Sequence, residues 1–67
     1  MDRFDAMQAF VRVAETGSFT RAATDLGLAR ATVTQLVQQL EARLRVRLLD
    51  RTTRRVTLTA DGSAFLE

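Results

Sequence analysis

The sequence predicts one small, mainly α-helical domain in which three helices precede a two-stranded β-hairpin and the start of a fourth helix. Three observations lead to this prediction. Apolar residues recur every three to four positions in three segments before residue 45, the period of an amphipathic helix. After that residue, apolar and polar residues alternate, as in half-buried strands. Glycine separates the helical segments, and glycine permits the backbone conformations that sharp turns need.

The first two helices are predicted over residues 1–16 and 19–26. Gly17 ends the first helix, and Ser18 can cap the second because its hydroxyl accepts a free backbone N–H. Gly27 ends the second helix at a sharp turn. The expected core positions are Phe4, Met7, Phe10 or Val11, and Ala14 in the first helix, and Phe19, Ala22, Ala23 and Leu26 in the second.

A third and longest helix is predicted over residues 30–44. A continuous apolar stripe runs along it, and the opposite face is uncharged or basic near its start, with an acid later. The stripe is expected to face the core and the polar side to face solvent. The stripe consists of Val33, Leu36, Val37, Leu40 and Leu44, and the polar face of Arg30, Ala31, Thr34, Gln35, Gln38 and Glu41.

The spacing across the second and third helices predicts a helix-turn-helix. This motif needs a small residue where two helices cross closely, then a glycine for the tight turn, then aliphatic residues that hold the crossing helices together. A plain helical hairpin within a bundle is the alternative. The four required positions are filled by Ala23, Gly27, Val33 and Leu36, and Ala22, Leu26 and Leu28 are expected to supply the remaining buried positions.

Two short strands around a basic loop predict a β-hairpin after the third helix. Residues 50–55 form its polar, arginine-rich tip. The strands are expected to carry Val46 and Leu48 on one side of that tip, and Val56 and Leu58 on the other. Residues 59–62 can cap a fourth helix, which begins before the sequence ends at residue 67.

The charge distribution points to a polyanion as the partner. The formal charge is only +2, but residues 43–55 hold six arginines against one aspartate, a local charge of +5. Such a patch can attract a polyanion, although an ordinary solvated face is the alternative. A helix fits the major groove of B-DNA, and a basic hairpin beside it can reach phosphates or the adjacent minor groove. Helix and hairpin together therefore favour binding to double-stranded DNA.

The composition argues against other classes of protein. The chain has no cysteine and no histidine, which excludes disulfides, thiolate metal sites and the usual nucleophile–base pairs. Its scattered carboxylates form no convincing acid–base pair, so we expect neither an enzyme nor a cofactor. No apolar run approaches the roughly 20 residues of a membrane span, and no secretory leader opens the chain. We therefore expect a soluble cytoplasmic protein, associated with the nucleoid.

The combined motifs resemble the N-terminal DNA-binding domain of LysR-type transcription regulators. The resemblance covers the whole chain. It lies in GSFTRAA at 17–23, LGL at 26–28, Val33-Thr34, Leu40-Glu41, and RLLDRTTRRVTLT at 47–59 closed by Gly62.

This resemblance implies a three-helix winged helix-turn-helix with a two-stranded β-wing over residues 1–59. Residues 60–67 would then begin a linker helix that dimerises in the full-length protein. It also implies a small-molecule effector that acts only through an absent C-terminal domain. One domain of this size offers few base contacts, so we expect two copies to bind an inverted-repeat operator. The isolated chain is expected to be a monomer or a weak dimer.

The resemblance also implies two groups of DNA contacts. An arginine can pair with guanine, a glutamine with adenine, and a threonine can meet a thymine methyl group. The expected base-reading residues are Arg30, Ala31, Thr34, Gln35 and Gln38, and the expected phosphate or minor-groove contacts are Ser18, Thr20, Arg51, Thr53, Arg54 and Arg55.

Several of these residues have an alternative role. Arg30 is as well suited to a phosphate as to a base, and Thr34 can hydrogen-bond its own helix backbone. Capping alone would explain Ser18. Arg51 is a candidate for packing and for anchoring the backbone. Arg54 and Arg55 are the strongest candidates for contacts from the wing tip.

The chain departs from the family pattern at three positions. Ala29 stands where a serine usually caps the recognition helix, and a lost cap costs about 1 kcal/mol. That helix is therefore expected to fray, or to start later and use Thr32. Arg30 stands where the family often has glutamine or proline. An arginine there is expected to make a longer, charged contact with DNA in place of a sequence-reading one. Arg45 stands where glycine is common, at a strain of about 1 kcal/mol if the site needs a positive φ.

Two other interpretations remain open. The chain could be a protein-interaction or dimerisation module that uses apolar faces of the first and last helices. Loss of DNA binding without loss of self-association, on substitution of Arg54 and Arg55, would distinguish the two. Within the DNA-binding class, another winged-helix family is the alternative, which the wing sequence disfavours.

Overall fold

The computed structural model describes residues 3–51 and 56–66, with side chains described from residue 5 onward. It confirms the predicted mainly α-helical fold of three helices, a two-stranded wing and a fourth helix. The elements are α1 (Arg3–Thr16), α2 (Phe19–Leu26), α3 (Arg30–Leu44), β1 (Leu49–Asp50), β2 (Thr57–Leu58) and α4 (Ala60–Leu66). No helix in these ranges is long and apolar enough to cross a membrane.

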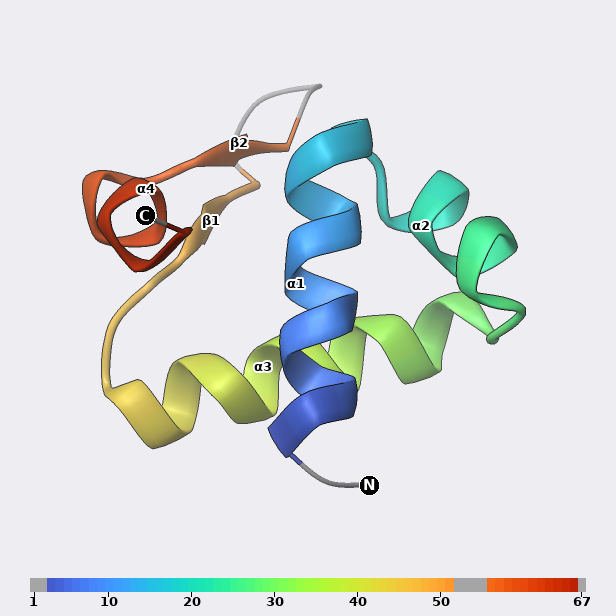
Figure 1. Ribbon diagram of the computed structural model, residues 1–67, viewed down its shortest axis with the longest axis horizontal. Coiled ribbons are helices and arrows are strands. Elements are labelled where there is room, and N and C mark those ends of the chain that lie inside the picture. Colours follow the sequence, from blue (N-terminus) through green and yellow to red (C-terminus); the bar gives the residue numbers. More distant parts are fainter. Residues whose placement is uncertain (1–2, 52–55, 67) are drawn as a thin grey trace.

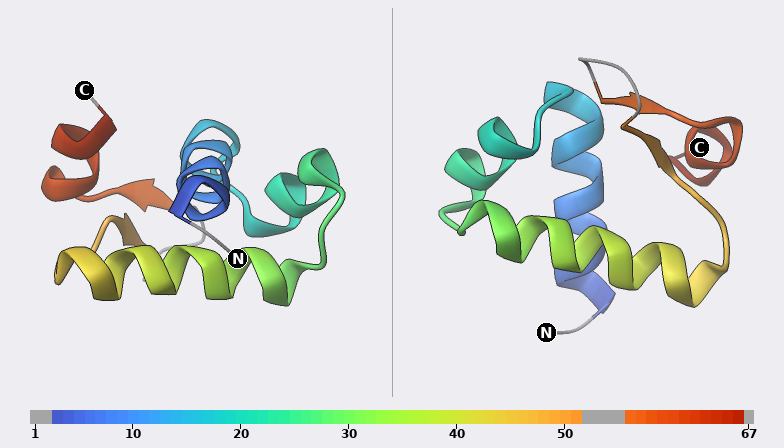
Figure 2. Two further views of the ribbon diagram at one scale, coloured as in Figure 1. Left: turned by 60° about the horizontal axis from the view of Figure 1, so that its bottom comes forward. Right: turned by 180° about the vertical axis from the view of Figure 1, so that it is seen from behind.

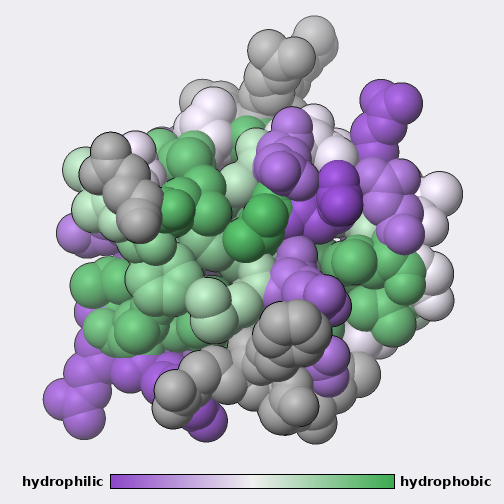
Figure 3. All heavy atoms as spheres, in the orientation of Figure 1, coloured by the Kyte–Doolittle hydropathy of each residue, from purple (hydrophilic) through white to green (hydrophobic). Residues whose placement is uncertain are grey.

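The helices and the wing are arranged around the crossing of α1 and α3. Figure 1 shows α1 crossing α3, with α2 on one side of α1 and the wing and α4 on the other. The strands β1 and β2 are antiparallel, with Leu49 opposite Leu58 and Asp50 opposite Thr57. In the same orientation, exposed apolar surface gathers on the side that carries α4, and a smaller apolar patch lies on the α2 side (Figure 3).

The core lies where α1 meets α3. Phe10 and Val13 of α1 are fully buried. The predicted core face of α1 was partly wrong, because Met7 is 38% exposed. The small side chains of Ala6 and Ala9 face the core instead, since they allow α3 to approach closely. The buried apolar residues are Ala6, Ala9, Phe10, Val13, Phe19, Ala22, Ala23, Val33, Leu36, Val37, Leu40, Leu48 and Leu49.

The turn between α2 and α3 has the predicted geometry. The Ser18 hydroxyl accepts the N–H of Arg21 at 3.1 Å and caps α2. Gly27 has a φ of 69°, and the Leu28 N–H after it bonds to the Ala23 carbonyl at 2.9 Å, closing the end of α2. The expected burial of Leu28 was wrong: it is 39% exposed, because it lies in the turn itself.

Helix α3 begins at Arg30 although Ala29 makes no side-chain cap. The Ala29 carbonyl accepts the N–H of Val33 at 3.1 Å, so the first helical turn closes without a cap. The expected later start at Thr32 is therefore wrong, whereas the missing cap is confirmed. At the other end, Arg45 has a φ of 60°, the left-handed conformation that the family's usual glycine at this position predicted.

The end of α3 and the start of the wing differ in detail from the prediction. Leu44 and Val46 are 37% and 36% exposed. Val46 lies outside β1, whereas Leu48 and Leu49 are both fully buried. The predicted alternation fails here because Leu48 precedes the strand and turns into the core before the regular pleat begins.

Helix α4 packs closely against the wing. The Thr59 hydroxyl accepts the N–H of Gly62 at 3.0 Å, which confirms the predicted cap at the start of α4. Gly62 is buried, and a Cβ there would lie 2.0 Å from the Leu48 carbonyl oxygen. Further along α4, the ring of Phe65 contacts Phe10 edge-on, with centroids 5.7 Å apart. These contacts fix α4 beside the α1 core.

Candidate nucleic-acid interface

The solvent side of α3 carries the predicted base-reading residues. Four of them are exposed and Thr34 is half-buried. Seen from behind in Figure 2, α3 lies in front of α1, so this side of α3 has no helix over it. The helical period places residues three, four and seven apart on one face. The structure therefore brings together Arg30, Ala31, Thr34, Gln35 and Gln38 on one exposed surface.

One member of this surface has a hydrogen bond within its own helix. The Thr34 hydroxyl donates to the Arg30 carbonyl oxygen at 3.1 Å. This bond supports the alternative role for Thr34, but the hydroxyl oxygen keeps free acceptor capacity. Arg30 and Gln35 are exposed with no hydrogen bond or ion pair from their side chains to other described residues. Their polar groups are therefore free to meet a ligand.

The start of α2 carries two further predicted contacts, Ser18 and Thr20. Ser18 is half-buried and its hydroxyl caps α2, which supports the capping role for this residue. Thr20 is exposed on the first turn of α2. Backbone N–H groups at the start of a helix, together with its dipole, favour an anion. Thr20 and the start of α2 therefore remain a predicted phosphate contact.

A buried carboxylate joins α3 to the wing. Glu41 is only 9% exposed. Its Oε2 accepts the backbone N–H groups of Leu48 and Leu49 at 2.8 and 3.3 Å. Its Oε1 lies 3.5 Å from Nη2 of Arg51. The Glu41 side chain therefore accepts the two backbone N–H groups at the start of β1 and also pairs with Arg51, the residue that follows β1.

Arg51 extends this connection to α2. Its guanidinium carbon lies 4.6 Å from the centre of the Phe19 ring, a distance at which a cation is attracted to the face of the ring. The side chain is 27% exposed, and its Nε is buried with no hydrogen-bond partner among the described residues. These contacts favour the packing role over the phosphate contact. The other predicted wing contacts, Thr53, Arg54 and Arg55, lie outside the described residues.

Sequence reasoning placed Glu41 on the solvent face and missed its role. A signal was present in the spacing. Glu41 stands four residues after Val37 and three before Leu44, so it lies at the edge of the apolar stripe and not opposite it. An acid at the edge of a core stripe, just before a strand, can meet free backbone donors.

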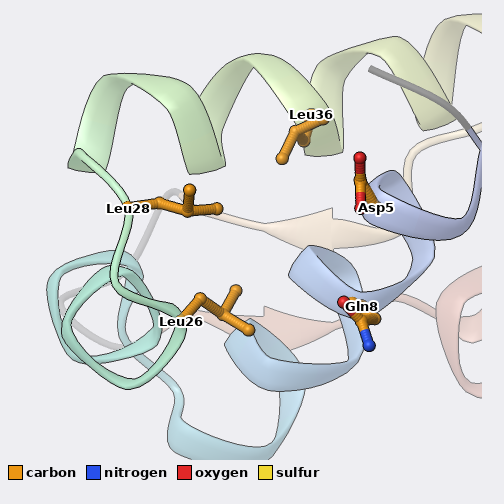
Figure 4. Close-up of a pocket in the computed structure, with 5 residues that line it drawn as sticks. All are labelled: Asp5, Gln8, Leu26, Leu28 and Leu36. Atoms are coloured by element: carbon orange, nitrogen blue, oxygen red, sulfur yellow. The ribbon is translucent and has the colours of Figure 1, made fainter.

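Shallow hollows also lie on the surface of the described residues. One of about 200 Å³ lies between α1, the turn and α3 and is lined by Asp5, Gln8, Leu26, Leu28 and Leu36 (Figure 4). Three of the five lining residues are leucines. No group of three metal-ligating side chains occurs in the part of the chain that the structure describes. The exposed face of α3, and not a pocket, is therefore the candidate site.

The comparison with known families agrees with this geometry. Residues 4–63 match the family described as bacterial regulatory helix-turn-helix protein, lysR family. The chain belongs to the LysR family.

Relatives in this LysR family are transcription regulators. The chain is 57% identical over all 67 residues to an HTH-type transcriptional repressor of Pseudomonas aeruginosa, and it spans 21% of that protein. It is 44% identical over 61 residues, or 91% of its own length, to the regulator CrgA of Neisseria meningitidis, and it spans 20% of CrgA. The chain therefore covers about a fifth of the length of these relatives.

Solved LysR-family structures share the fold. The DNA-binding domain of BenM in complex with catB site 1 DNA matches with a TM-score of 0.89 and 37% identity, over 97% of this chain and 71% of that one. Full-length CbnR complexed with its target DNA matches with a TM-score of 0.89 and 42% identity, over 98% of this chain and 23% of CbnR. The chain has the winged helix-turn-helix fold of LysR-type DNA-binding domains.

Proposed function

We propose that this chain binds double-stranded DNA as the operator-recognition domain of a LysR-type transcription regulator. The observation that carries the proposal is the exposed face of α3, which holds arginine, threonine and glutamine with no helix packed over it. These are the side chains that read base edges in the major groove. Two solved relatives, BenM and CbnR, are complexes with DNA, which supports the same ligand for this chain.

In the proposed complex, α3 lies in the major groove and the wing lies on phosphates or in the minor groove. The first turns of α3, with Arg30, Thr34 and Gln35, supply specificity. Thr20 and the start of α2 hold a phosphate, which fixes the register of the domain on the duplex. Arg51 contributes by holding the wing against α2, whereas Arg54 and Arg55 make the wing contacts.

The larger protein is proposed to be an oligomeric regulator. Residues 1–59 would form the DNA-binding unit, and residues 60–67 would begin the linker helix that pairs two copies on an inverted repeat. A small molecule would act through a separate effector domain. As a cytoplasmic regulator, and not an enzyme, the protein would need no cofactor.

The test is an amide-resolved NMR titration of the chain with a short mixed-sequence DNA duplex at low and moderate salt. We expect shifts concentrated at residues 30–38 and at the wing, and we expect them to weaken as salt rises. A matched titration of the variant Gln35→Ala would report whether α3 contacts bases. Shifts confined to α1 would refute the proposed surface.

A protein-interaction role is the second candidate. Phe65 and Leu66 at the end of α4 are 37% and 41% exposed, which favours a partner helix there. The two roles are compatible, because the dimerising helix and the DNA-reading face lie on different elements. If amides of α4 respond to protein concentration while α3 ignores DNA, the interaction role is the correct one.

A further inference from the structure

Three arginines form a separate basic surface at the C-terminal end of α3. Arg43, Arg45 and Arg47 lie within five positions of one another and all are exposed. None has a side-chain hydrogen bond or ion pair with any other residue that the structure describes. Of the two acids near them in sequence, Glu41 is already bound to Leu48, Leu49 and Arg51, and Asp50 is half-buried in β1. Neither acid forms an ion pair with any of the three arginines in the part of the chain that the structure describes.

The backbone at the centre of this surface is strained. Arg45 is the only residue other than glycine with a positive φ among the described residues, at 60°. Its N–H bonds to the Glu41 carbonyl, and the following Val46 N–H does the same at 3.2 Å. Glycine would make both bonds without strain. Because the backbone conformation favours glycine at this position, we attribute the presence of arginine to a function of its side chain.

Attraction to the helix dipole accounts for only part of this surface. Cations near the C-terminal end of a helix are favourable, but the effect falls off within the last turn. Arg43 lies in that turn, whereas Arg47 lies three residues after α3 ends. In the orientation of Figure 1, strongly hydrophilic side chains project from the corner where α3 ends (Figure 3). That corner is at the opposite end of α3 from Arg30.

The length of α3 places this corner near a DNA backbone. A helix of 15 residues is about 22 Å long, at 1.5 Å per residue. The major groove is about 12 Å wide. A helix whose first turns occupy the groove therefore extends past its edge, where one phosphate backbone runs. Guanidinium groups bind phosphate oxygens with two parallel hydrogen bonds.

We propose that Arg43, Arg45 and Arg47 form a second phosphate-binding surface, distinct from the wing, which binds the DNA backbone at the edge of the groove that α3 reads. This inference rests on the proposed function, because it needs DNA beside α3. It assigns the basic residues before the wing a role of their own.

The decisive variant is Arg45→Gly, because strain and binding predict opposite changes. Relief of the positive φ should raise the Tm by about 4 °C. Loss of one phosphate contact should reduce the slope of log K against log salt by about 0.9. The variant should therefore bind DNA less tightly than the unaltered chain at 0.05 M salt, and this difference should shrink about threefold at 0.2 M salt. A variant that is more stable and binds DNA less tightly cannot owe its weaker binding to unfolding.

The full test measures fluorescence anisotropy of a labelled duplex between 50 and 200 mM salt. The triple variant Arg43→Gln, Arg45→Gly, Arg47→Gln should lose about 40-fold less affinity over that range than the unaltered chain. The control is Arg12→Gln, which removes one exposed charge from α1 and should leave the slope unchanged. Unaltered affinity and slope in the triple variant, while the unaltered chain binds DNA, would overturn the inference. Failure of the unaltered chain to bind any duplex would instead overturn the proposed function.

Discussion

The carboxylate of Glu41 is the single group on which the attachment of the wing most depends. We predict that Glu41→Ala destabilises the chain strongly. The substitution leaves the N–H groups of Leu48 and Leu49 without their acceptor, and both residues are 0% exposed. Water cannot replace the lost acceptor without opening the start of the wing. The substitution Glu41→Ala also removes the ionic partner of Arg51.

The size of the effect follows from these contacts. A buried donor left unsatisfied costs about 1–3 kcal/mol. The bond to Leu48 is short, at 2.8 Å, whereas the bond to Leu49 is weaker, at 3.3 Å. The pair with Arg51 is long and 27% exposed on the arginine side, so it adds less than about 1 kcal/mol. Together these terms give a loss of about 3–4 kcal/mol.

That loss is a large share of the stability available to a small domain. At about 0.05–0.15 kcal/mol per residue, a chain of this length has about 3–10 kcal/mol in total. Urea unfolding followed by circular dichroism at 222 nm measures the difference. Glu41→Gln should cost less, about 1–2 kcal/mol, because an amide oxygen in place of Oε2 can still accept both N–H groups, whereas the charge that pairs with Arg51 is lost.

The matched control is Glu15→Ala. Glu15 also pairs with an arginine, Arg12, at 3.1 Å, but both side chains are exposed. We expect this control to change the free energy of unfolding by less than about 0.5 kcal/mol. If Glu41→Ala costs less than about 1 kcal/mol, or no more than the control, the reasoning about the buried carboxylate is refuted.

Three further substitutions test the backbone. Gly62→Ala should lower the free energy of unfolding by about 1–3 kcal/mol, because the new Cβ would lie 2.0 Å from the Leu48 carbonyl oxygen. The displaced α4 should also weaken the Phe10–Phe65 contact. Unchanged thermal unfolding and unchanged aromatic NMR shifts would contradict this prediction. Gly27→Ala should lower the free energy of unfolding by about 1 kcal/mol through the strain of its positive φ alone, since nothing lies within 4 Å of the new Cβ. A larger loss of stability in urea unfolding would contradict this prediction. Ala29→Ser should add about 1 kcal/mol by capping α3, and no rise in Tm would show that α3 needs no cap.

The sequence predicted the turn chemistry well because it depends on local geometry. Ser18 and Gly27 were recognised from residue type and position, and the structure shows the expected cap and left-handed turn. The positive φ at Arg45 was instead expected from the resemblance, because the family commonly has glycine there, and the structure shows it. In each case, the residues that decide the conformation lie within one helical turn.

The sequence predicted the core less well where two helical faces overlap. In α1, Met7 and Ala6 are neighbours in the chain, and the apolar period alone allowed either face to point inward. Only the approach of α3 decided that Ala6 is buried and Met7 is 38% exposed, because small side chains permit the closer crossing.

For the candidate site, the sequence by itself determined that Arg30, Ala31, Thr34, Gln35 and Gln38 share one face of α3, because the helical period fixes that face, but it wrongly included Glu41, which is buried. Tertiary structure alone decided that Glu41 and Arg51 meet. They are ten positions apart, on helix α3 and directly after strand β1, two elements whose relative orientation no local pattern sets. Long-range pairing of polar groups depends on where whole elements pack, and packing depends on the shapes of side chains from every element at once.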